Sequence, residues 1–466
     1  MSFHFKKLGL ALALTGSLAG CSAVVKTPYN SPSVQVPQQF QYDVQKNKNV
    51  NLSDQWWALF NDAQLNQLVE QVLAKNSDLI VAGITLKQAR LQAGLAENQQ
   101  GIRTSSSVST GHNYDLRSGN GTDRGLSTSV GVSYELDLFG KLANQTEASR
   151  WEALASAQDL QATAQSLVAT TAKLYWQLGY LNERYNTIQQ NLASTQKIYK
   201  LVQSQYKAGA VSGLDLTQAE QSVQSQKASL SQIEQQRVET RTAIAVLLHM
   251  PVQQLSIQES KQLPRNALPN IAVGLPADIL SRRPDLQASE LRLRKTLSNK
   301  DATKASYYPS INLTGNLGAS STSLTQLLKN PALTLGASLS LPFLQYNDMK
   351  KDIAISDLEY EKAIIQYRQT LYQAFADVEN ALSNRTQLNQ QVQLQQRNVE
   401  LANKTERLTE VRYRNGAIAL KNLLDAQETT RNARLSLVET KQSQYNAYVT
   451  LMQALGGSPV KELLVQ

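Results

Sequence analysis

Histidine and cysteine, which often bind metals or act in catalysis, are scarce in this chain. Its 466 residues include three histidines and one cysteine. The sequence has no His-Glu-x-x-His, no Gly-x-Ser-x-Gly and no phosphate-binding Gly-Lys-Ser/Thr loop. The Gly119-Asn-Gly121 stretch fits no nucleotide-binding motif. The sequence therefore predicts that the protein is not an enzyme and uses no cofactor or metal.

Charged residues are also few. They make up 18% of the chain, below the usual share of about 25%, and Gln, Ser, Asn and Thr take their place. Soluble coiled coils are normally rich in Glu and Lys, so long helices of this composition are unusual in being polar but weakly charged. The formal net charge is +9, but the positive residues are scattered along the sequence. This pattern predicts no nucleic-acid partner.

Long apolar runs are missing beyond the N-terminus. There, Lys6 and Lys7 precede the apolar segment Leu8–Leu18, which is too short to span a bilayer as a helix. No later segment has the roughly 18 consecutive apolar residues that a membrane-spanning helix needs. Residues 1–20 are therefore predicted to be a signal peptide.

The single cysteine directly follows this segment. The sequence Leu18-Ala19-Gly20-Cys21 resembles the bacterial lipobox, in which the signal is cut before the cysteine and the thiol is acylated. The resemblance implies a lipid anchor on Cys21, and Ser22 after it implies sorting to the outer membrane. The ordinary alternative is a signal peptide with a bystander thiol. Residues 21–61 are then predicted to form an extended tether and an equatorial segment.

Glycine and proline are both missing from one very long stretch, Phe343 to Asn415. Pro342 precedes it and Gly416 follows it. Because these two residue types end helices, the stretch is predicted to be a single helix of roughly 110 Å at 1.5 Å per residue. Heptad-like spacing within it predicts a narrow apolar seam for packing against another helix. The seam residues are Leu371, Phe375, Val378, Leu382, Leu394, Leu401 and Leu408.

Apolar and polar residues alternate with a period of two in four short segments. Two of them lie at about 102–138 and two at about 308–343. In the clearest one, Leu126 to Leu138, apolar residues alternate with polar or small ones. This pattern is typical of strands with one apolar face. It predicts two β-hairpins.

The chain also repeats itself. Tyr206–Val211 matches Tyr413–Ile418, and Asp78-Leu79 matches Asp285-Leu286, at the same offset of 207 residues. Two distant matches at one offset indicate tandem duplication. Asp78 is in addition a candidate N-cap for the helix after it. The predicted organisation is a first repeat at 62–250, a proline-containing connector at 251–276, a second repeat at 277–457 and a tail at 458–466.

Four strands cannot close a membrane barrel, because known barrels start at about eight and open strand edges are not viable in lipid. Two chains would supply eight strands and three would supply twelve, and three-fold closure better fits a water-filled lumen. The fold class predicted is mainly α. Long helical hairpins form a periplasmic α-barrel, and four strands per chain close a 12-stranded membrane β-barrel in a homotrimer.

Four longer motifs stand at fixed places in this plan. They are Gly274–Asp285 (Gly-Leu-Pro-Ala-Asp-Ile-Leu-Ser-Arg-Arg-Pro-Asp), Tyr134–Gly140, Tyr308–Ile311 and Leu423–Gln427. Together they resemble the TolC-type outer-membrane efflux channels, in the NodT-like lipoprotein branch that serves resistance-nodulation-division pumps. The resemblance covers nearly the whole mature chain. It implies a homotrimer, a periplasmic adaptor (membrane fusion protein) docked on the helical tips, and an inner-membrane pump of the resistance-nodulation-division type.

In that family the periplasmic end closes like an iris, held by hydrogen bonds and ion pairs near the tips. The resemblance assigns gate positions to Asp215, Tyr413 and Asp425. An acidic ring from three chains would repel anions and attract cations at a narrow mouth. Each residue also has an ordinary alternative. Asp215 can cap a helix, Asp425 can lie on a solvated helix face, and Tyr413 can pack under the turn.

The chain departs from the family pattern at the second tip. One family gate uses an arginine two residues after the tip glycine, where this chain has Ile418, and a second gate carboxylate corresponds to Asn422. A hydrophobic constriction near Ile418 or Leu420 is therefore the alternative to an ion-pair latch. The adaptor is expected to dock on the paired tips, at Gly209, Ala210, Gly416 and Ala417.

Three functions are compatible with these observations. The first is the exit duct of a tripartite efflux pump, passively conducting drugs or other small molecules. The second is an outer-membrane duct for secreted proteins or peptides, and the third is a purely structural coiled coil. The two-faced strands disfavour the third, while the lipobox and the Gly-Leu-Pro connector favour the first.

Overall fold

The computed structural model describes residues 25–42, 55–114, 121–265, 268–269, 271, 282–321, 324–329 and 331–457. The predicted signal peptide, the predicted lipidation site Cys21 and the predicted tail lie outside these residues. The chain divides into two compact units. The first contains the described residues within 1–34, 84–158 and 287–370, and the second those within 35–83, 159–286 and 371–466. Each unit thus takes segments from both sequence repeats.

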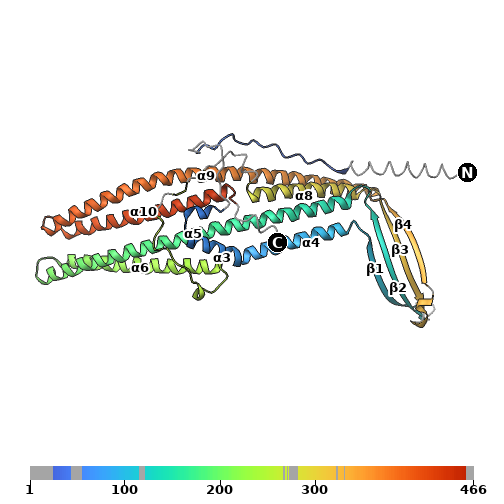
Figure 1. Cartoon of the computed structure of the whole chain (residues 1–466), viewed down its shortest axis with the longest axis horizontal. Helices are drawn as coiled ribbons and strands as arrows, with labels where there is room; N and C mark the ends of the chain where they lie inside the picture. The colour runs from blue at the N-terminus through green and yellow to red at the C-terminus, as the bar shows by residue number, and fades with distance from the viewer. Residues whose placement is uncertain are drawn as a thin grey trace. The chain divides into compact units, whose positions relative to one another are not determined.

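Helices make up most of the described chain (Figure 1). They are α3 (Ala63–Lys75), α4 (Ser77–Asn98), α5 (Lys141–Lys207), α6 (Gly213–Leu247), α8 (Pro284–Ser306), α9 (Tyr346–Arg414) and α10 (Leu420–Ala454). The two longest, α5 and α9, have 67 and 69 residues, or roughly 100 Å each at 1.5 Å per residue. The predicted long helix is confirmed, except that it begins after a short 3-10 turn, η4 (Pro342–Leu344). None of the described helices is long and apolar enough to cross a membrane.

Further 3-10 turns lie before α3, after α6 and between two of the strands described below. They are η1 (Trp56–Phe60), η2 (Val252–Gln254) and η3 (Leu324–Lys329).

The break between α3 and α4 is made by Asn76, and the prediction that Asp78 caps α4 is wrong. The Asn76 side-chain oxygen accepts hydrogen bonds from the backbone N–H groups of Asp78 (2.9 Å) and Leu79 (3.3 Å). Asp78 itself lies in the first turn of α4, where a carboxylate is favoured by the helix dipole. The sequence placed the break within two residues and assigned the cap to the wrong side chain.

Asn76 has a second role that is repeated in the other half of the chain. Its Nδ2 donates to the carbonyl of Leu247 at the end of α6, at 3.0 Å. At the 207-residue offset, Arg283 Nη1 donates to the carbonyl of Ala454 at the end of α10, at 3.4 Å. Each repeat therefore ties the start of one of its short helices to the end of its return helix.

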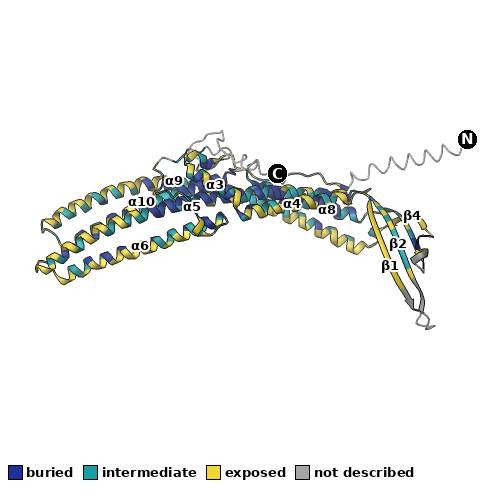
Figure 2. Cartoon of the chain, turned by 60° about the horizontal axis from the view of Figure 1, so that its bottom comes forward, coloured by how far each residue is buried: buried dark blue, intermediate teal, exposed yellow. Residues whose placement is uncertain are grey.

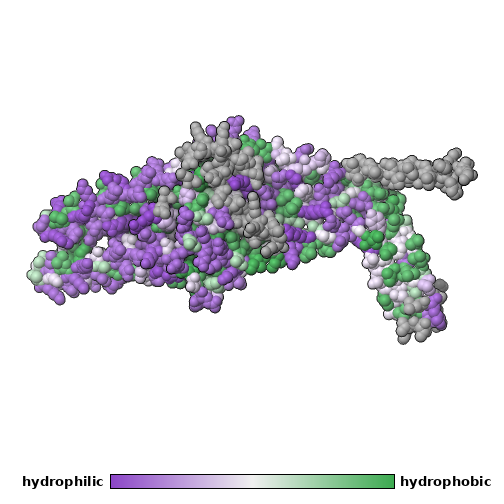
Figure 3. Space-filling model, in the orientation of Figure 1, coloured by the Kyte–Doolittle hydropathy of each residue, from purple (hydrophilic) through white to green (hydrophobic). Residues whose placement is uncertain are grey.

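The four predicted strands form one antiparallel sheet in the first unit, in the order β1-β2-β3-β4. They are β1 (Arg103–Tyr114), β2 (Gly121–Leu136), β3 (Ser310–Ser321) and β4 (Pro331–Ser340). Both predicted hairpins are confirmed, and β2 pairs with β3 to join the two repeats. β1 and β4 are left as the two edges of the sheet. Hydrophobic residues gather over the strands in the space-filling view (Figure 3).

An aromatic cluster forms the core of the second unit. The Phe60 ring contacts those of Trp176, Tyr445 and Tyr448, and the Trp176 ring also contacts that of Tyr445, with ring centroids 4.7 Å apart for Phe60–Trp176 and 4.9 Å for Trp176–Tyr445. Trp56 and Trp57 are both buried beside them. The Tyr445 hydroxyl donates to the carbonyl of Pro264, in the predicted connector at 251–276, at 3.0 Å. Buried residues concentrate near α3 in this unit and thin out toward the free ends of its helices (Figure 2).

Gly456 provides a test of the junction at the end of α10. Its φ is +76°, and a Cβ there would lie 2.7 Å from the carbonyl carbon of Arg282. Gly456→Ala should therefore reduce the free energy of unfolding by about 3 kcal/mol, from the left-handed backbone and the clash together. Gly416→Ala is the matched control, since its φ is +70° with nothing within 4 Å, and about 1 kcal/mol is expected. Equal losses of thermal stability in the purified variants would contradict the close contact.

Candidate gate and docking site

Both helical hairpins turn through the same backbone motif. Gly209 and Gly416 adopt left-handed φ values of +72° and +70°. In the first tip, Gly209 N–H donates to the Tyr206 carbonyl and Ala210 N–H to the Gln205 carbonyl, both at 2.9 Å. The second tip repeats both bonds with the equivalent residues at the same distances. These paired bonds define a Schellman motif, so the repeated tip sequence gives the repeated tip structure.

The two tips differ in how the following helix is capped. Ser212 caps α6 by accepting from the Asp215 N–H at 3.3 Å, and the Asp215 carboxylate accepts from the Ser212 N–H at 3.0 Å. These reciprocal bonds form a capping box. In the second repeat the N-cap of α10 is Ala419, which makes no side-chain cap. The candidate gate residue Asp215 is thus a capping residue within its own chain.

A small apolar cluster lies beneath the tips and joins the two repeats. Its buried members are Val202 on α5, Ala219 on α6 and Leu420 on α10. Leu420 is 3% exposed, so in this conformation its side chain has no free face with which to narrow a channel. Ile418 is only partly buried and is the better placed of the two predicted constriction residues.

Tyr413 packs against this cluster. Its hydroxyl donates to Gln205 Oε1 on α5 at 3.3 Å, which links the two tips. Burial raises the pKa of Tyr413, and the negative charge of Asp215 raises it further. Two of the three predicted gate residues, Asp215 and Tyr413, therefore lie close enough for the charge of one to affect the pKa of the other.

The third predicted gate residue, Asp425, lies on the exposed surface of α10. Its carboxylate pairs with Lys421 Nζ at 2.6 Å, and both side chains are more than half exposed. An exposed i,i+4 pair adds little stability. Its importance is electrostatic, because the lysine sits within one helical turn of the predicted acidic ring and offsets its charge.

The predicted docking residues are all exposed at the tips, namely Gly209, Ala210, Gly416 and Ala417. Nothing lies within 4 Å of a Cβ built on either glycine. Leu214 and Tyr206, 66% and 46% exposed, add apolar surface to the first tip. The arrangement leaves the tips free to receive a partner.

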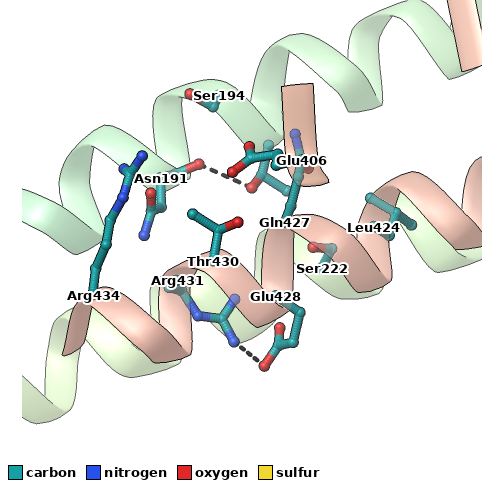
Figure 4. A pocket seen from close by; sticks show the side chains of 11 residues that line it. Asn191, Ser194, Ser222, Glu406, Leu424, Gln427, Glu428, Thr430, Arg431 and Arg434 are labelled. Atoms are coloured by element: carbon teal, nitrogen blue, oxygen red, sulfur yellow. Dashed lines mark hydrogen bonds and ion pairs between the residues drawn. The ribbon is translucent and has the colours of Figure 1, made fainter. Parts of the chain in front are cut away.

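A polar cleft of about 230 Å³ lies behind the tips, between helices of both repeats (Figure 4). It is lined by Asn191, Ser194, Thr195, Ser222, Glu406, Leu424, Gln427, Glu428, Thr430, Arg431 and Arg434. Arg431 pairs with Glu428, and Thr430 is buried and donates to the Ala402 carbonyl at 3.1 Å. The sequence did not predict that Thr430 is buried in this cleft. The one indication was that Thr430 is polar where the first repeat has Val223. Within the described part of the chain no group of His, Cys, Asp or Glu could hold a metal ion.

Known proteins resemble this chain over nearly their full length. The MtrE outer-membrane channel of Neisseria gonorrhoeae, solved in its open state, is 27% identical and superposes with a TM-score of 0.81, covering 94% of this chain and 99% of that one. The toluene efflux pump outer-membrane protein TtgC of Pseudomonas putida is 30% identical over 96% of this chain and 95% of its own. The toxin and drug export protein A of Aggregatibacter actinomycetemcomitans is 27% identical over 98% of both chains.

Long helical hairpins and a four-stranded antiparallel sheet on this plan define an outer-membrane channel of efflux systems, with a periplasmic helical extension and no enzymatic activity. The family model for outer membrane efflux proteins matches twice, at residues 68–248 and 275–457. The chain belongs to this family. The two matches begin 207 residues apart, so the predicted duplication is confirmed.

The caps at the two tips give a prediction about their local stability. Ser212→Ala should speed amide hydrogen exchange in the first turn of α6, because losing an N-cap costs about 1 kcal/mol. Ala419→Ser should slow exchange in the first turn of α10 by a similar free energy, since the Ala419 backbone (φ −69°, ψ 155°) already suits a cap. Hydrogen exchange by mass spectrometry measures both changes.

A comparison of Ser212→Ala with Asp215→Asn separates the two roles of Asp215. If Asp215 acts only as a cap, Asp215→Asn and Ser212→Ala will change channel conductance equally. A change confined to Asp215→Asn would instead assign the carboxylate a part in the gate.

Proposed function

We propose that this chain is the outer-membrane exit duct of a tripartite efflux pump, in the lipoprotein branch that serves resistance-nodulation-division systems. In this proposal a homotrimer passively conducts drugs or other small molecules to the outside. The observation that carries it is the sheet with two open edges. β1 and β4 each have one strand neighbour, and unpaired edges are not viable in lipid. Three copies would pair β4 of one with β1 of the next and close a 12-stranded barrel.

Uncovered apolar residues on α9 support the same assembly. Leu394, Leu401 and Leu408, spaced by seven residues, are 63%, 49% and 59% exposed in the single chain. A strip of this kind suits side-by-side packing against a helix of a second copy. Many of the other α9 side chains are Gln, Asn and Glu, which suit a wall with water on both sides.

The lipid anchor remains a proposal from the sequence. Acylation of Cys21 would hold the N-terminus in the outer membrane. The residues that follow are fixed to the first unit, where Thr27 donates to both carboxylate oxygens of buried Asp301 at 2.7 Å. A tether fixed so soon after the predicted anchor would place this unit close to the lipid.

The partners would be a periplasmic adaptor and an inner-membrane pump. The adaptor would dock on the exposed tips at Gly209, Ala210, Gly416 and Ala417. The tips would also carry the gate, in which Asp215, Tyr413, Asp425 and Ile418 act at the narrow end. The names of the toluene efflux protein TtgC and of the toxin and drug export protein A favour efflux of small molecules. The word toxin in the second name keeps a protein or peptide secretion duct as the second candidate.

A deletion strain tests the proposal directly. Loss of the gene should lower the minimum inhibitory concentration of several drugs or solvents, with no change in the secreted proteins, because the duct would carry small molecules. Complementation with the wild-type chain is the control. Unchanged susceptibility together with loss of a secreted protein would reject efflux and favour the second candidate.

Crosslinking tests the partner in the complemented strain. Single cysteines at Ala210 or Ala417 should crosslink to an adaptor, whereas a cysteine at exposed Leu335 on β4 should not. The absence of a crosslink at both tip positions would reject docking there.

The proposed gate has its own charge test. Asp425→Ala should lower the cation-to-anion permeability ratio by about twofold, because a ring of carboxylates is lost at a narrow mouth. Lys421→Ala should raise the ratio by about as much, because the charge that offsets Asp425 is removed. Reversal potentials of purified channels in planar bilayers measure both. No change in either variant would remove Asp425 from the gate.

A further inference from the structure

One face of the sheet is made of serine, threonine, asparagine and glycine residues with few exceptions. Direct contacts define this face. Ser107 and Ser109 hydrogen bond across the hairpin to Ser129 (2.9 Å) and Ser127 (2.7 Å). A Cβ on Gly131 would lie 2.8 Å from Ser105 Oγ and 3.7 Å from Asn316 Oδ1. Residues of β1, β2 and β3 therefore project to the same side.

The opposite face is apolar over β2, β3 and β4. A Cβ on Gly315 would lie 3.1 Å from Val132 Cγ2 and 3.4 Å from Leu335 Cδ2, so these residues share that side. In a membrane barrel the apolar face meets lipid and the polar face meets the water-filled interior. The polar face is therefore the bore wall of the channel proposed above.

The polar face can be listed from the strand register. It comprises Arg103, Ser105, Ser107, Ser109, Gly111, Gly125, Ser127, Ser129, Gly131, Ser133, Glu135, Ser310, Asn312, Thr314, Asn316, Gly318, Ser320, Ala332, Thr334, Gly336, Ser338 and Ser340. Only Arg103 and Glu135 carry a charge among these side chains. Both lie at the ends of the strands that adjoin the helices α4 and α5.

The two charges are not equivalent. Glu135 is paired with Lys141 Nζ at 2.5 Å, and both side chains are largely buried. Arg103 is exposed and has no ion pair or hydrogen bond from its side chain to any described residue. Its cross-strand neighbour is the neutral Ser133. Arg103 is thus the unpaired charge of the described polar face.

We propose that the described part of the strand wall forms a neutral, hydroxyl-lined section of the channel with one charged ring, contributed by Arg103 from each of three copies, and that this ring makes the section favour anions. The inference rests on the proposed trimer, because the ring needs all three chains. At about 0.1 M salt the Debye length is about 10 Å, so charges on the wall act well into a bore, whereas at 1 M it is about 3 Å. The selectivity of the ring therefore weakens as salt rises.

This wall would favour one chemical class of transported solute, namely neutral and anionic molecules over cations. Serine, threonine and asparagine side chains exchange hydrogen bonds with water and with neutral solutes of any kind, so the described wall offers no charge barrier apart from the Arg103 ring. The ring adds attraction for carboxylates, phosphates and other anions and repulsion for cations. The described strand wall carries no unpaired carboxylate that would favour cations.

Reversal potentials in planar bilayers test the ring, with a tenfold KCl gradient kept at or below about 0.1 M. Arg103→Gln should lower the chloride-to-potassium permeability ratio by about twofold relative to wild type, and Arg103→Lys should retain it. The difference should vanish near 1 M KCl, where the field is screened. Lys329→Gln is the matched control, because it removes the same charge from an exposed residue of η3 outside the strands.

Two further variants test the ring if Arg103→Gln yields no channels: Ser105→Arg, which adds a charge, and Arg103→Cys, which can be labelled. Ser105→Arg, two residues further along the same face, should raise the ratio. Arg103→Cys should recover the wild-type ratio when a channel already conducting in the bilayer reacts with a cationic methanethiosulfonate, and should reverse it with an anionic one. Wild-type channels treated with the same reagents control for reaction at Cys21.

The outcomes separate this inference from the proposed function. Channels that conduct with the wild-type ratio in Arg103→Gln and Ser105→Arg, or that shift equally in Lys329→Gln, overturn the ring and leave the exit duct intact. Wild-type protein that forms no channel overturns both.

Discussion

The unpaired backbone along β1 and β4 is the constraint on which the rest of the structure depends. Each edge strand presents a row of N–H and C=O groups that must find partners if the sheet is to enter lipid. The sheet cannot satisfy them by curling on itself with four strands. The same sequence therefore has to encode a second surface, on the helices, that is compatible with the same association. The exposed leucines of α9 are a surface of that kind, and the many Gln, Asn and Glu side chains of the helix suit a wall in contact with water.

Much of the fold could be predicted because it depends on local patterns. The absence of glycine and proline from Phe343 to Asn415 is sufficient for a long helix, and the alternation around Leu126 to Leu138 is sufficient for a strand with two faces. The tip turns follow from a glycine that can adopt a positive φ. Each of these features depends on a few neighbouring residues, which the sequence displays directly.

The candidate site was less predictable because it depends on contacts between distant segments. Leu420 looked like a free apolar residue at a tip, and it is buried because α5 and α6 of the other repeat pack over it. Asp425 looked like a solvated acid, and Lys421 one turn earlier offsets its charge. Asn76 displaced Asp78 as a cap because it also reaches the end of α6. Each outcome depends on a contact that a local pattern does not show: the packing over Leu420, the ion pair of Asp425, and the bond from Asn76 to the end of α6.

The two repeats have the same backbone turns and differ in the side chains that surround them. The tips share their turn and differ in capping, and the junctions share a bond to a terminal carbonyl and differ in charge. Asn76 and Arg283 each connect the start of a short helix to the end of the return helix of the same repeat. The two repeats nevertheless depend on each other, because β2 pairs with β3 and Trp176 of the first repeat packs against Tyr445 of the second, so two separately made fragments would have to associate to rebuild the sheet and the aromatic core.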